Sequence, residues 1–226
     1  MAGRSSRLIS AAAAVLVALA VLCAGTARAA GPTVPTVVLG GHLYPKPYGD
    51  AYVYGHAELP DSADQSLVAA QTVTLYSSNF PFTGWVQVAT LTTDFEGYFS
   101  YHTSISQNTE YRAIWQTATP VQSKDKLVKL PLKLSLRASH TRVHKKGVVT
   151  FTGASAPAHP GSKVLIQQMD HNGYFKTISS TTVTAASTYS SRVRLRRGGV
   201  FRALFGGDNF FGVDASRPVR VAVGKR

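Results

Sequence analysis

The chain is poor in cysteine. Its 226 residues include a single one, Cys23, and this residue lies within the first 30 positions. The rest of the chain therefore has no disulfide, thiolate zinc site, iron-sulfur cluster or cysteine nucleophile. We expect its folded part to be stabilised by hydrophobic cores alone.

Helical spacing of apolar residues is also nearly absent after residue 30. Apolar and polar residues alternate instead, in segments separated by Gly, Pro, Asn, Asp and Ser, which is typical of strands. Such segments are 51–54, 73–76, 132–137, 192–196 and 219–223. The sequence contains no G-x-S-x-G, H-E-x-x-H or phosphate-binding loop motif. These absences predict an all-β protein that is not an enzyme and carries no cofactor.

The first 30 residues have the pattern of a secretory signal peptide. Arg4 and Arg7 precede an apolar run over 8–22, and small residues at 27 and 29 suit cleavage after Ala29 or Ala30. Ser10 and the many alanines make the run weak for a permanent membrane anchor. Leu22 before Cys23 argues against a lipoprotein signal. We therefore expect a secreted, extracellular protein with no transmembrane segment after signal removal.

Part of the chain repeats itself at an offset of 90 residues. Residues 85–115 align without a gap with residues 175–205, and size and polarity match along the alignment although only four positions are identical. A repeat this long indicates two small domains and not a solenoid. About seven short strands per copy predict two tandem Ig-like antiparallel β-sandwiches. We place an acidic first domain at 31–130 and a basic second domain at 131–226, joined near Leu130-Pro131-Leu132.

Two turns and eight aromatic residues refine this expectation. Residues 94–97 and 170–173 each have Asp first and Gly fourth, which predicts type I turns in hairpins. The aligned aromatics are predicted to be core residues and not a carbohydrate-stacking surface; they are Trp85, Phe99, Tyr111, Trp115, Phe175, Tyr189, Phe201 and Phe205. The aligned Arg112 and Arg202 are expected to point outward, toward an acidic residue on a neighbouring strand.

The repeated pattern resembles the bacterial Ig-like and fibronectin-III-like repeats of exported actinobacterial proteins. An early Gly (Gly55, Gly153) is followed by a bulky aromatic, by Thr93-Asp94-x-x-Gly97-x-Phe99, by an aromatic-Arg pair and by a last Ser-led strand (Ser123, Ser216). Residues 183–187 of the second copy depart from this pattern, because Asp and Gly are both missing there. The resemblance implies the fold. Since such repeats serve as spacers, adhesins and accessory modules, it implies no single function.

Acidic residues are scarce in the second half. Residues 31–128 contain four basic and eight acidic residues, a net charge of −4, whereas residues 129–226 contain 17 basic and three acidic residues, a net charge of +14. This asymmetry predicts that the second half is attracted to polyanions. Arg192, Arg194 and Arg196 share one face of a predicted strand at intervals of about 7 Å.

We interpret these arginines as a ladder for repeated phosphates or uronates. Arg197, Lys145 and Lys146 are expected to join it, with Lys133, Arg137 and Arg220 adding to the field. The alternative interpretation is a solvated face that discourages sheet-to-sheet aggregation. In the glycine-rich segment 206–212, one of Phe210 and Phe211 is expected to face inward. The other is expected to contact a partner or a membrane surface, or alternatively to pack on the linker.

Metal sites have little support in the sequence. His140 and His144 lie four residues apart, a spacing that converges on a helix but not on strands, and no carboxylate accompanies them. The acidic loops of the first half lack a D-x-D-x-D-G pattern for calcium. We therefore expect a non-catalytic, exported binding protein whose basic domain contacts an anionic envelope polysaccharide or teichoic acid, polymers that suit an exported protein better than nucleic acid. The alternative is a structural spacer, or a module that binds a protein partner and no polymer.

Overall fold

The computed structural model describes residues 34–44, 48–60 and 65–224, and the predicted signal peptide lies outside them. The described residues form strands and one short 3-10 helix, η1 (Gln65–Val68). The predicted all-β fold is confirmed.

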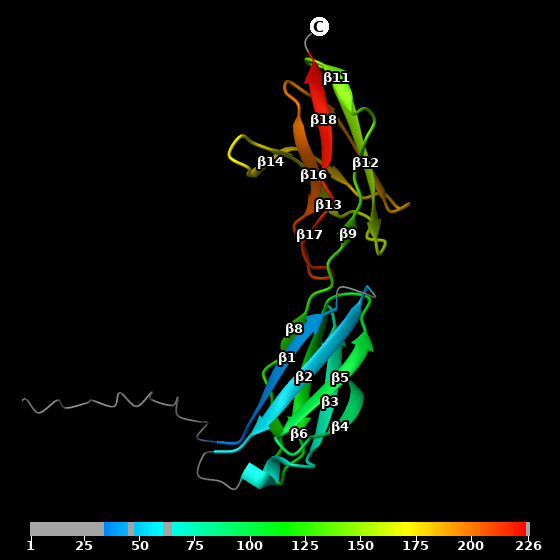
Figure 1. Cartoon of the computed structure of the whole chain (residues 1–226). Coiled ribbons are helices and arrows are strands. Elements are labelled where there is room, and N and C mark those ends of the chain that lie inside the picture. The colour runs from blue at the N-terminus through cyan, green and yellow to red at the C-terminus, as the bar shows by residue number, and fades with distance from the viewer. Residues whose placement is uncertain (1–33, 45–47, 61–64, 225–226) are drawn as a thin grey trace, which may run out of the picture. The chain divides into compact units, whose positions relative to one another are not determined.

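The first sandwich consists of a three-stranded and a five-stranded sheet. Strand β2 pairs with β1 and β5, strand β3 pairs with β4 and β6, and β6 pairs with β7 and β8, all antiparallel. This order, in which the second strand pairs with the fifth and the third with the sixth, is the Ig-like arrangement (Figure 1). The strands are β1 (Thr36–Leu43), β2 (Asp50–Glu58), β3 (Thr72–Asn79), β4 (Val86–Thr92), β5 (Tyr98–Ser104), β6 (Thr109–Trp115), β7 (Val121–Gln122) and β8 (Lys126–Val128).

The second sandwich has the same order with a divided first strand. Strand β12 pairs with β9, β10 and β15 in one sheet; β13 pairs with β14 and β16, and β16 with β17 and β18, in the other. Strand β11 runs parallel to β18. The strands are β9 (Lys133–Leu134), β10 (Arg137–Ala138), β11 (Arg142–His144), β12 (Val148–Ala156), β13 (Lys163–Met169), β14 (Phe175–Thr182), β15 (Thr188–Arg194), β16 (Gly199–Phe205), β17 (Asp214–Ala215) and β18 (Val219–Gly224).

The predicted alternation places the core between the sheets. On β2, Ala51 and Val53 are buried while Tyr52 and Tyr54 face outward. Leu132, Leu134 and Leu136 are buried while Lys133, Ser135 and Arg137 are exposed. Six of the eight aromatics predicted to be core residues are buried: Phe99, Tyr111, Trp115, Tyr189, Phe201 and Phe205.

The prediction is wrong for Trp85 and Phe175, which are only half-buried. The guanidinium of Arg112 lies 3.9 Å from the ring centre of Trp85, and that of Arg202 lies 4.0 Å from the ring centre of Phe175. Each ring is therefore covered by an arginine on the outer face of its sheet and not by the opposite sheet.

One of the two predicted hairpins is correct. Residues Asp170–Gly173 join β13 to β14, which pair, and the amide of Gly173 donates to the carbonyl of Asp170. Residues Asp94–Gly97 form the same turn, but they join β4 to β5, which belong to different sheets. The hairpin prediction at 94–97 is wrong because turn chemistry does not show which strand each flanking segment pairs with.

Matching hydrogen bonds support the repeat. The amide of Ala113 donates to Ser123 Oγ at 2.9 Å, and that of Ala203 donates to Ser216 Oγ at 3.0 Å. The 184–187 turn, which has neither Asp nor Gly, makes the backbone bonds of the 94–97 turn, and Ser187 has φ 60° where Gly97 has φ 90°. The turn is therefore kept in the second copy with a serine in the left-handed region, where a side chain is strained.

The two strand sets meet at residues 130–132. Every named strand pairs within 36–128 or within 133–224, and Pro131 makes an isolated bridge with Gly212. Leu130 and Leu132 are fully buried. The backbone amide of the buried Asn108 donates to the carbonyl of Phe210 at 2.7 Å, and its side-chain Oδ1 accepts from the amide of Leu130 at 2.9 Å. The domain boundary at 130/131 stays a prediction.

Candidate cationic binding surface

Strand pairing brings the predicted basic residues together at one end of the second sandwich. Val148 on β12 pairs with Arg194 on β15, so the β11–β12 turn with Lys145 and Lys146 lies beside the β15–β16 turn with Arg196 and Arg197. The amide of Lys146 donates to the carbonyl of Leu195 at 2.8 Å. We call this group the cationic end; it comprises Lys145, Lys146, Arg192, Arg194, Arg196 and Arg197.

The turn that carries Arg196 and Arg197 is held from three sides. The amide of Leu195 donates to the carbonyl of Gly147 at 2.9 Å, and the buried Gln168 donates its side-chain amide to the carbonyl of Gly198 at 3.2 Å. A Cβ on Gly198 would lie 2.8 Å from the carbonyl oxygen of Val221, so only glycine fits this close approach to β18. The backbone below the arginines is therefore anchored while their side chains extend outward.

All six members of the cationic end are exposed. None of them forms an ion pair with any carboxylate of the described residues. Asp170, which lines a hollow together with Arg197, pairs with Lys176 Nζ at 3.1 Å and accepts from the amides of Asn172 and Tyr174. Desolvation acts to raise the pKa of Asp170, but these bonds outweigh it and lower the pKa. This acid therefore stays charged and already has its partners.

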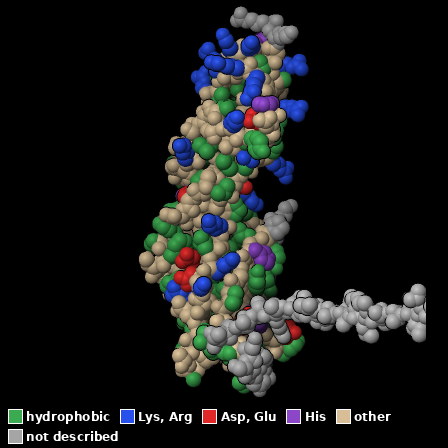
Figure 2. Space-filling model, turned by 90° about the vertical axis from the view of Figure 1, so that its left-hand side faces the viewer, with side chains coloured by type: hydrophobic (Ala, Val, Ile, Leu, Met, Phe, Trp, Pro, Cys, Tyr) green, Lys and Arg blue, Asp and Glu red, His purple; other side chains and the backbone are tan. Residues whose placement is uncertain are grey.

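Two hollows adjoin the cationic end. One, of about 520 Å³, is lined by Arg194, Arg196 and Arg197 together with Gln168 and Ile178. The other, of about 750 Å³, lies at β11 and β18 and is lined in part by His140, Arg142 and His144. Figure 2 shows one face of the molecule, on which Lys and Arg side chains are denser over the second sandwich than over the first.

Three further basic residues lie elsewhere. Lys133 pairs with Ala156, at the other end of β12 from Val148 and about 26 Å away along the strand. Its ammonium lies 4.3 Å from the ring centre of Tyr48. Arg137 pairs with Thr152 in the middle of β12, and Arg220 lies on β18, in the other sheet. They therefore do not extend the arginine row, and they add only to the general field.

In the segment 206–212, one phenylalanine faces inward and the other is exposed, as expected. Phe211 is buried, whereas Phe210 keeps 38% of its surface exposed. The ring of Phe210 packs edge-on against Phe80 of the first sandwich, with centres 4.9 Å apart. Asp208 caps this loop through the amides of Phe210 and Phe211, and its other carboxylate oxygen lies 2.6 Å from His159 Nε2. A binding role for either phenylalanine stays a prediction.

The aligned arginines have different partners. Arg112 Nε lies 2.7 Å from Asp125 Oδ1, as expected for an outward arginine beside an acidic residue. Arg202 Nε instead donates to Gln167 Oε1 at 2.9 Å. Among the described residues, no group of three or more His, Cys, Asp or Glu side chains could hold a metal ion. The described part of the chain also has no helix of the length and apolarity that a bilayer crossing requires.

Sequence reasoning missed two groups of surface residues. Arg142 and His144 are both exposed on β11, which directly precedes Lys145 and pairs with β18, and the alternation of 141–144 is the signal that could have shown their shared face. On the first sandwich, tyrosine and histidine side chains gather on the outer face of the β1-β2-β5 sheet, at positions that alternation marked only as outward.

Comparison with known proteins gives likenesses in structure alone. No protein-family model and no curated protein matches the chain. Among solved structures, a tetra-tandem repeat from the extending region of a large adhesion protein is similar over 83% of this chain, with 14% identity and a TM-score of 0.34, and the chain spans about half (49%) of its length. The ectodomain of the teleost fish polymeric Ig receptor is similar over 84% of this chain and 98% of its own, with 9% identity and a TM-score of 0.34. The fold assignment rests on the strand pairing described above.

Proposed function

We propose that this chain is an exported, non-catalytic binding protein whose cationic end contacts an anionic polymer of the cell envelope, such as an acidic polysaccharide or a teichoic acid. The observation that carries the proposal is the juxtaposition of two anchored turns, Lys145-Lys146 and Arg196-Arg197, with the arginines of β15. The four side chains of these turns are exposed, and none of them forms an ion pair with a carboxylate of the described residues.

The chemistry of this surface favours a repeated, flexible anion. Arginine side chains bind phosphate or carboxylate groups through two parallel hydrogen bonds, and exposed lysines add charge without fixed geometry. Arg192 and Arg194 lie two residues apart on an exposed face, about 7 Å along the strand. Successive anionic groups of one polymer chain can therefore meet successive side chains.

Retention of the full chain on purified cell wall, on lipoteichoic acid and on a polyuronate tests the proposal. We expect retention at low salt that falls steeply as the salt concentration rises, because released counterions contribute to binding. Replacing Arg194 and Arg196 by Ser should weaken retention roughly tenfold.

The matched control replaces Lys163 and Arg217 by Ser. Both residues are exposed, and this change removes the same charge from positions outside the cationic end. An equal loss of retention in the two double variants would show that net charge alone is responsible. No retention on any of the three materials would contradict the proposal and favour a spacer or a protein-binding module.

A further inference from the structure

The outer face of the β1-β2-β5 sheet carries tyrosine and histidine side chains in cross-strand rows. His42 pairs with Tyr52 and Tyr52 with His102 in one row, and His56 pairs with Tyr98 in another. In the row between them, Tyr54 is flanked by Gly40 on β1 and Ser100 on β5. The middle row therefore has one ring between two small residues, with taller rows on both sides.

These rings are fixed before any ligand arrives. The ring centres of Tyr52 and His102 lie 4.7 Å apart, and those of His42 and Tyr52 lie 5.5 Å apart. At the other end, His56 stacks on Tyr98 at 4.2 Å and is held by Glu58 at 3.0 Å and by the carbonyl of Glu96 at 2.8 Å. Rings that are already ordered lose little conformational entropy when a ligand binds.

Tyr54 lies low over the sheet. A Cβ on Gly40 would lie 2.3 Å from Cζ of the Tyr54 ring, so the ring occupies the space that a side chain at position 40 would need. Tyr54 nevertheless keeps 44% of its surface exposed. Gly40 thus lets the tyrosine lean over the neighbouring strand and present its surface to solvent.

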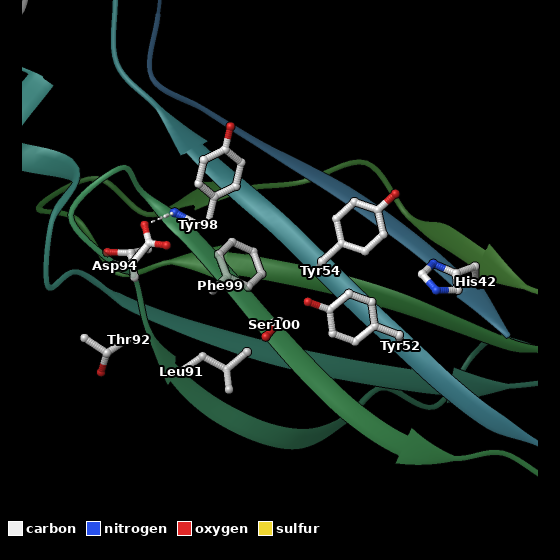
Figure 3. Close-up of a pocket in the computed structure, with 10 residues that line it drawn as sticks. His42, Tyr52, Tyr54, Leu91, Thr92, Asp94, Tyr98, Phe99 and Ser100 are labelled. Atoms are coloured by element: carbon white, nitrogen blue, oxygen red, sulfur yellow. Dashed lines mark hydrogen bonds between the residues drawn. The ribbon is translucent and has the colours of Figure 1, made fainter. Parts of the chain in front are cut away.

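A hollow of about 750 Å³ begins at these rings. It crosses Ser100 and reaches the end of β4, and its lining includes Tyr52, Tyr54, Tyr98 and Asp94 (Figure 3). Asp94 Oδ1 accepts from the amides of Glu96 and Tyr98, and Oδ2 has no partner among the described residues. The hollow therefore combines aromatic walls with an available acceptor at one end.

The polar atoms of the rings are available as well. The phenolic oxygens of Tyr52 and Tyr54 and the ring nitrogens of His42 and His102 have no hydrogen-bond partner within the part of the chain that the structure describes. The cross-strand rows hold one exposed aliphatic side chain, Val38, and no Lys or Arg. The surface therefore offers ring faces and hydrogen-bonding tips, with neither the aliphatic area that suits a protein or lipid surface nor the cations that suit a polyanion.

We propose that this aromatic face binds a neutral carbohydrate chain, with sugar rings stacked on Tyr54 and Tyr52 and their hydroxyls bonded to the tyrosine, histidine and Asp94 side chains. The C–H face of a sugar ring packs against an aromatic ring, and its hydroxyls need polar partners at the edges, which this surface supplies. This site is separate from the cationic end and does not depend on the function proposed for it.

Affinity electrophoresis of the full chain in gels that contain laminarin, mannan, galactan, xylan or dextran tests this site. We expect retardation by at least one of these neutral polymers, and binding of the same polymer measured by isothermal titration calorimetry should persist in 1 M NaCl, because no ion pair contributes. Tyr54→Ala should weaken binding about tenfold, whereas Tyr54→Phe, which keeps the ring, should weaken it no more than about threefold. Tyr174→Ala removes a more exposed tyrosine, in the β13–β14 turn, and should have no effect.

A second variant tests the site without removing Tyr54, in case Tyr54→Ala destabilises the sheet. Ser100 is exposed and lines the hollow, so Ser100→Trp should fill the hollow and weaken binding about tenfold while the melting temperature stays unchanged. The proposal is overturned if none of the polymers retards the protein, if Tyr54→Ala and Ser100→Trp both bind like the unmodified chain, or if 1 M NaCl abolishes binding. Binding to neutral lipid vesicles or to a protein partner alone would also overturn it.

Discussion

The outer faces of the corresponding three-strand layers in the two sandwiches carry opposite chemistry. On the fifth strand of the first sandwich, the outward residues are Tyr98, Ser100, His102 and Ser104, and the aligned residues of the second are Thr188, Ser190, Arg192 and Arg194. On the neighbouring strand, Tyr52 and Tyr54 correspond to Thr150 and Thr152. The backbone frame is shared, so the surface side chains alone make one face aromatic and neutral and the other cationic.

On the inward side of the same strands, the two sandwiches share a pair of one glycine and one aromatic residue. Gly55 pairs with Phe99 and Gly153 with Tyr189, and in both cases the ring lies where a glycine Cβ would stand. The hydroxyl of Tyr189 donates to the carbonyl of Ser135, which lies between β9 and β10. In the first sandwich β1 is continuous at this level and Phe99 has no hydroxyl. The additional hydroxyl therefore accompanies the divided first strand.

The largest expected effect comes from truncating a core ring of one sandwich. Phe201→Ala should lower the free energy of unfolding of the second sandwich by about 3–5 kcal/mol, because Phe201 is fully buried and packs on Phe151. Calorimetry should show one transition shifted down and the other shifted little. If both transitions move together, the two sandwiches unfold as one unit and the predicted domain boundary fails.

Exchanging the turn residues should change stability in opposite directions. Gly97→Ser should destabilise the first sandwich by about 1–3 kcal/mol, because Gly97 has φ 90° and its Cβ would lie 2.7 Å from the carbonyl oxygen of Ala57. Ser187→Gly should stabilise the second sandwich by about 0.5 kcal/mol, since it relieves a strained serine. Urea titration measures both, and equal signs would contradict the equivalence of the two turns.

Removing the hydroxyl of Tyr189 should loosen the first strand of the second sandwich and leave the first strand of the first sandwich unchanged. Burial raises the pKa of Tyr189, and its hydroxyl is the donor to the Ser135 carbonyl. Tyr189→Phe should cost about 1 kcal/mol because that carbonyl loses its donor. Hydrogen exchange at the amides of β9 and β10 should become faster, while exchange in β1 should not change. Unaltered protection of β10 would show that the hydroxyl does not hold the divided strand.

The smallest effect concerns the arginines over the outer rings. The hydrogen bond from Arg112 lowers the pKa of Asp125 below its ordinary value of 3.8, so this pair stabilises the fold above about pH 4 and the contribution is lost as the pH falls through the lowered pKa. Asp125→Asn should remove up to about 0.5 kcal/mol at pH 7, since the pair is partly exposed, and less at pH 2. Unfolding measured at both pH values checks this.

Arg202 provides the control for that measurement. Its partner, Gln167, carries no titrating group, so Gln167→Ala should have the same effect on the stability of the second sandwich at pH 7 and at pH 2. A cost of Asp125→Asn that does not depend on pH would show that the carboxylate charge is unimportant to the pair.

Alternation in the sequence by itself determined the all-β class, the buried leucines of 132–136 and the burial of Phe99, Tyr111 and Phe201, because a strand with one face on a core must alternate. It also determined that Arg192 and Arg194 share a face. Only the tertiary structure decided that 94–97 joins two sheets, that Trp85 and Phe175 lie under arginines, and that His42, Tyr52 and His102 form one row. Alternation tells which way a side chain points, whereas strand pairing between distant segments decides what it meets there.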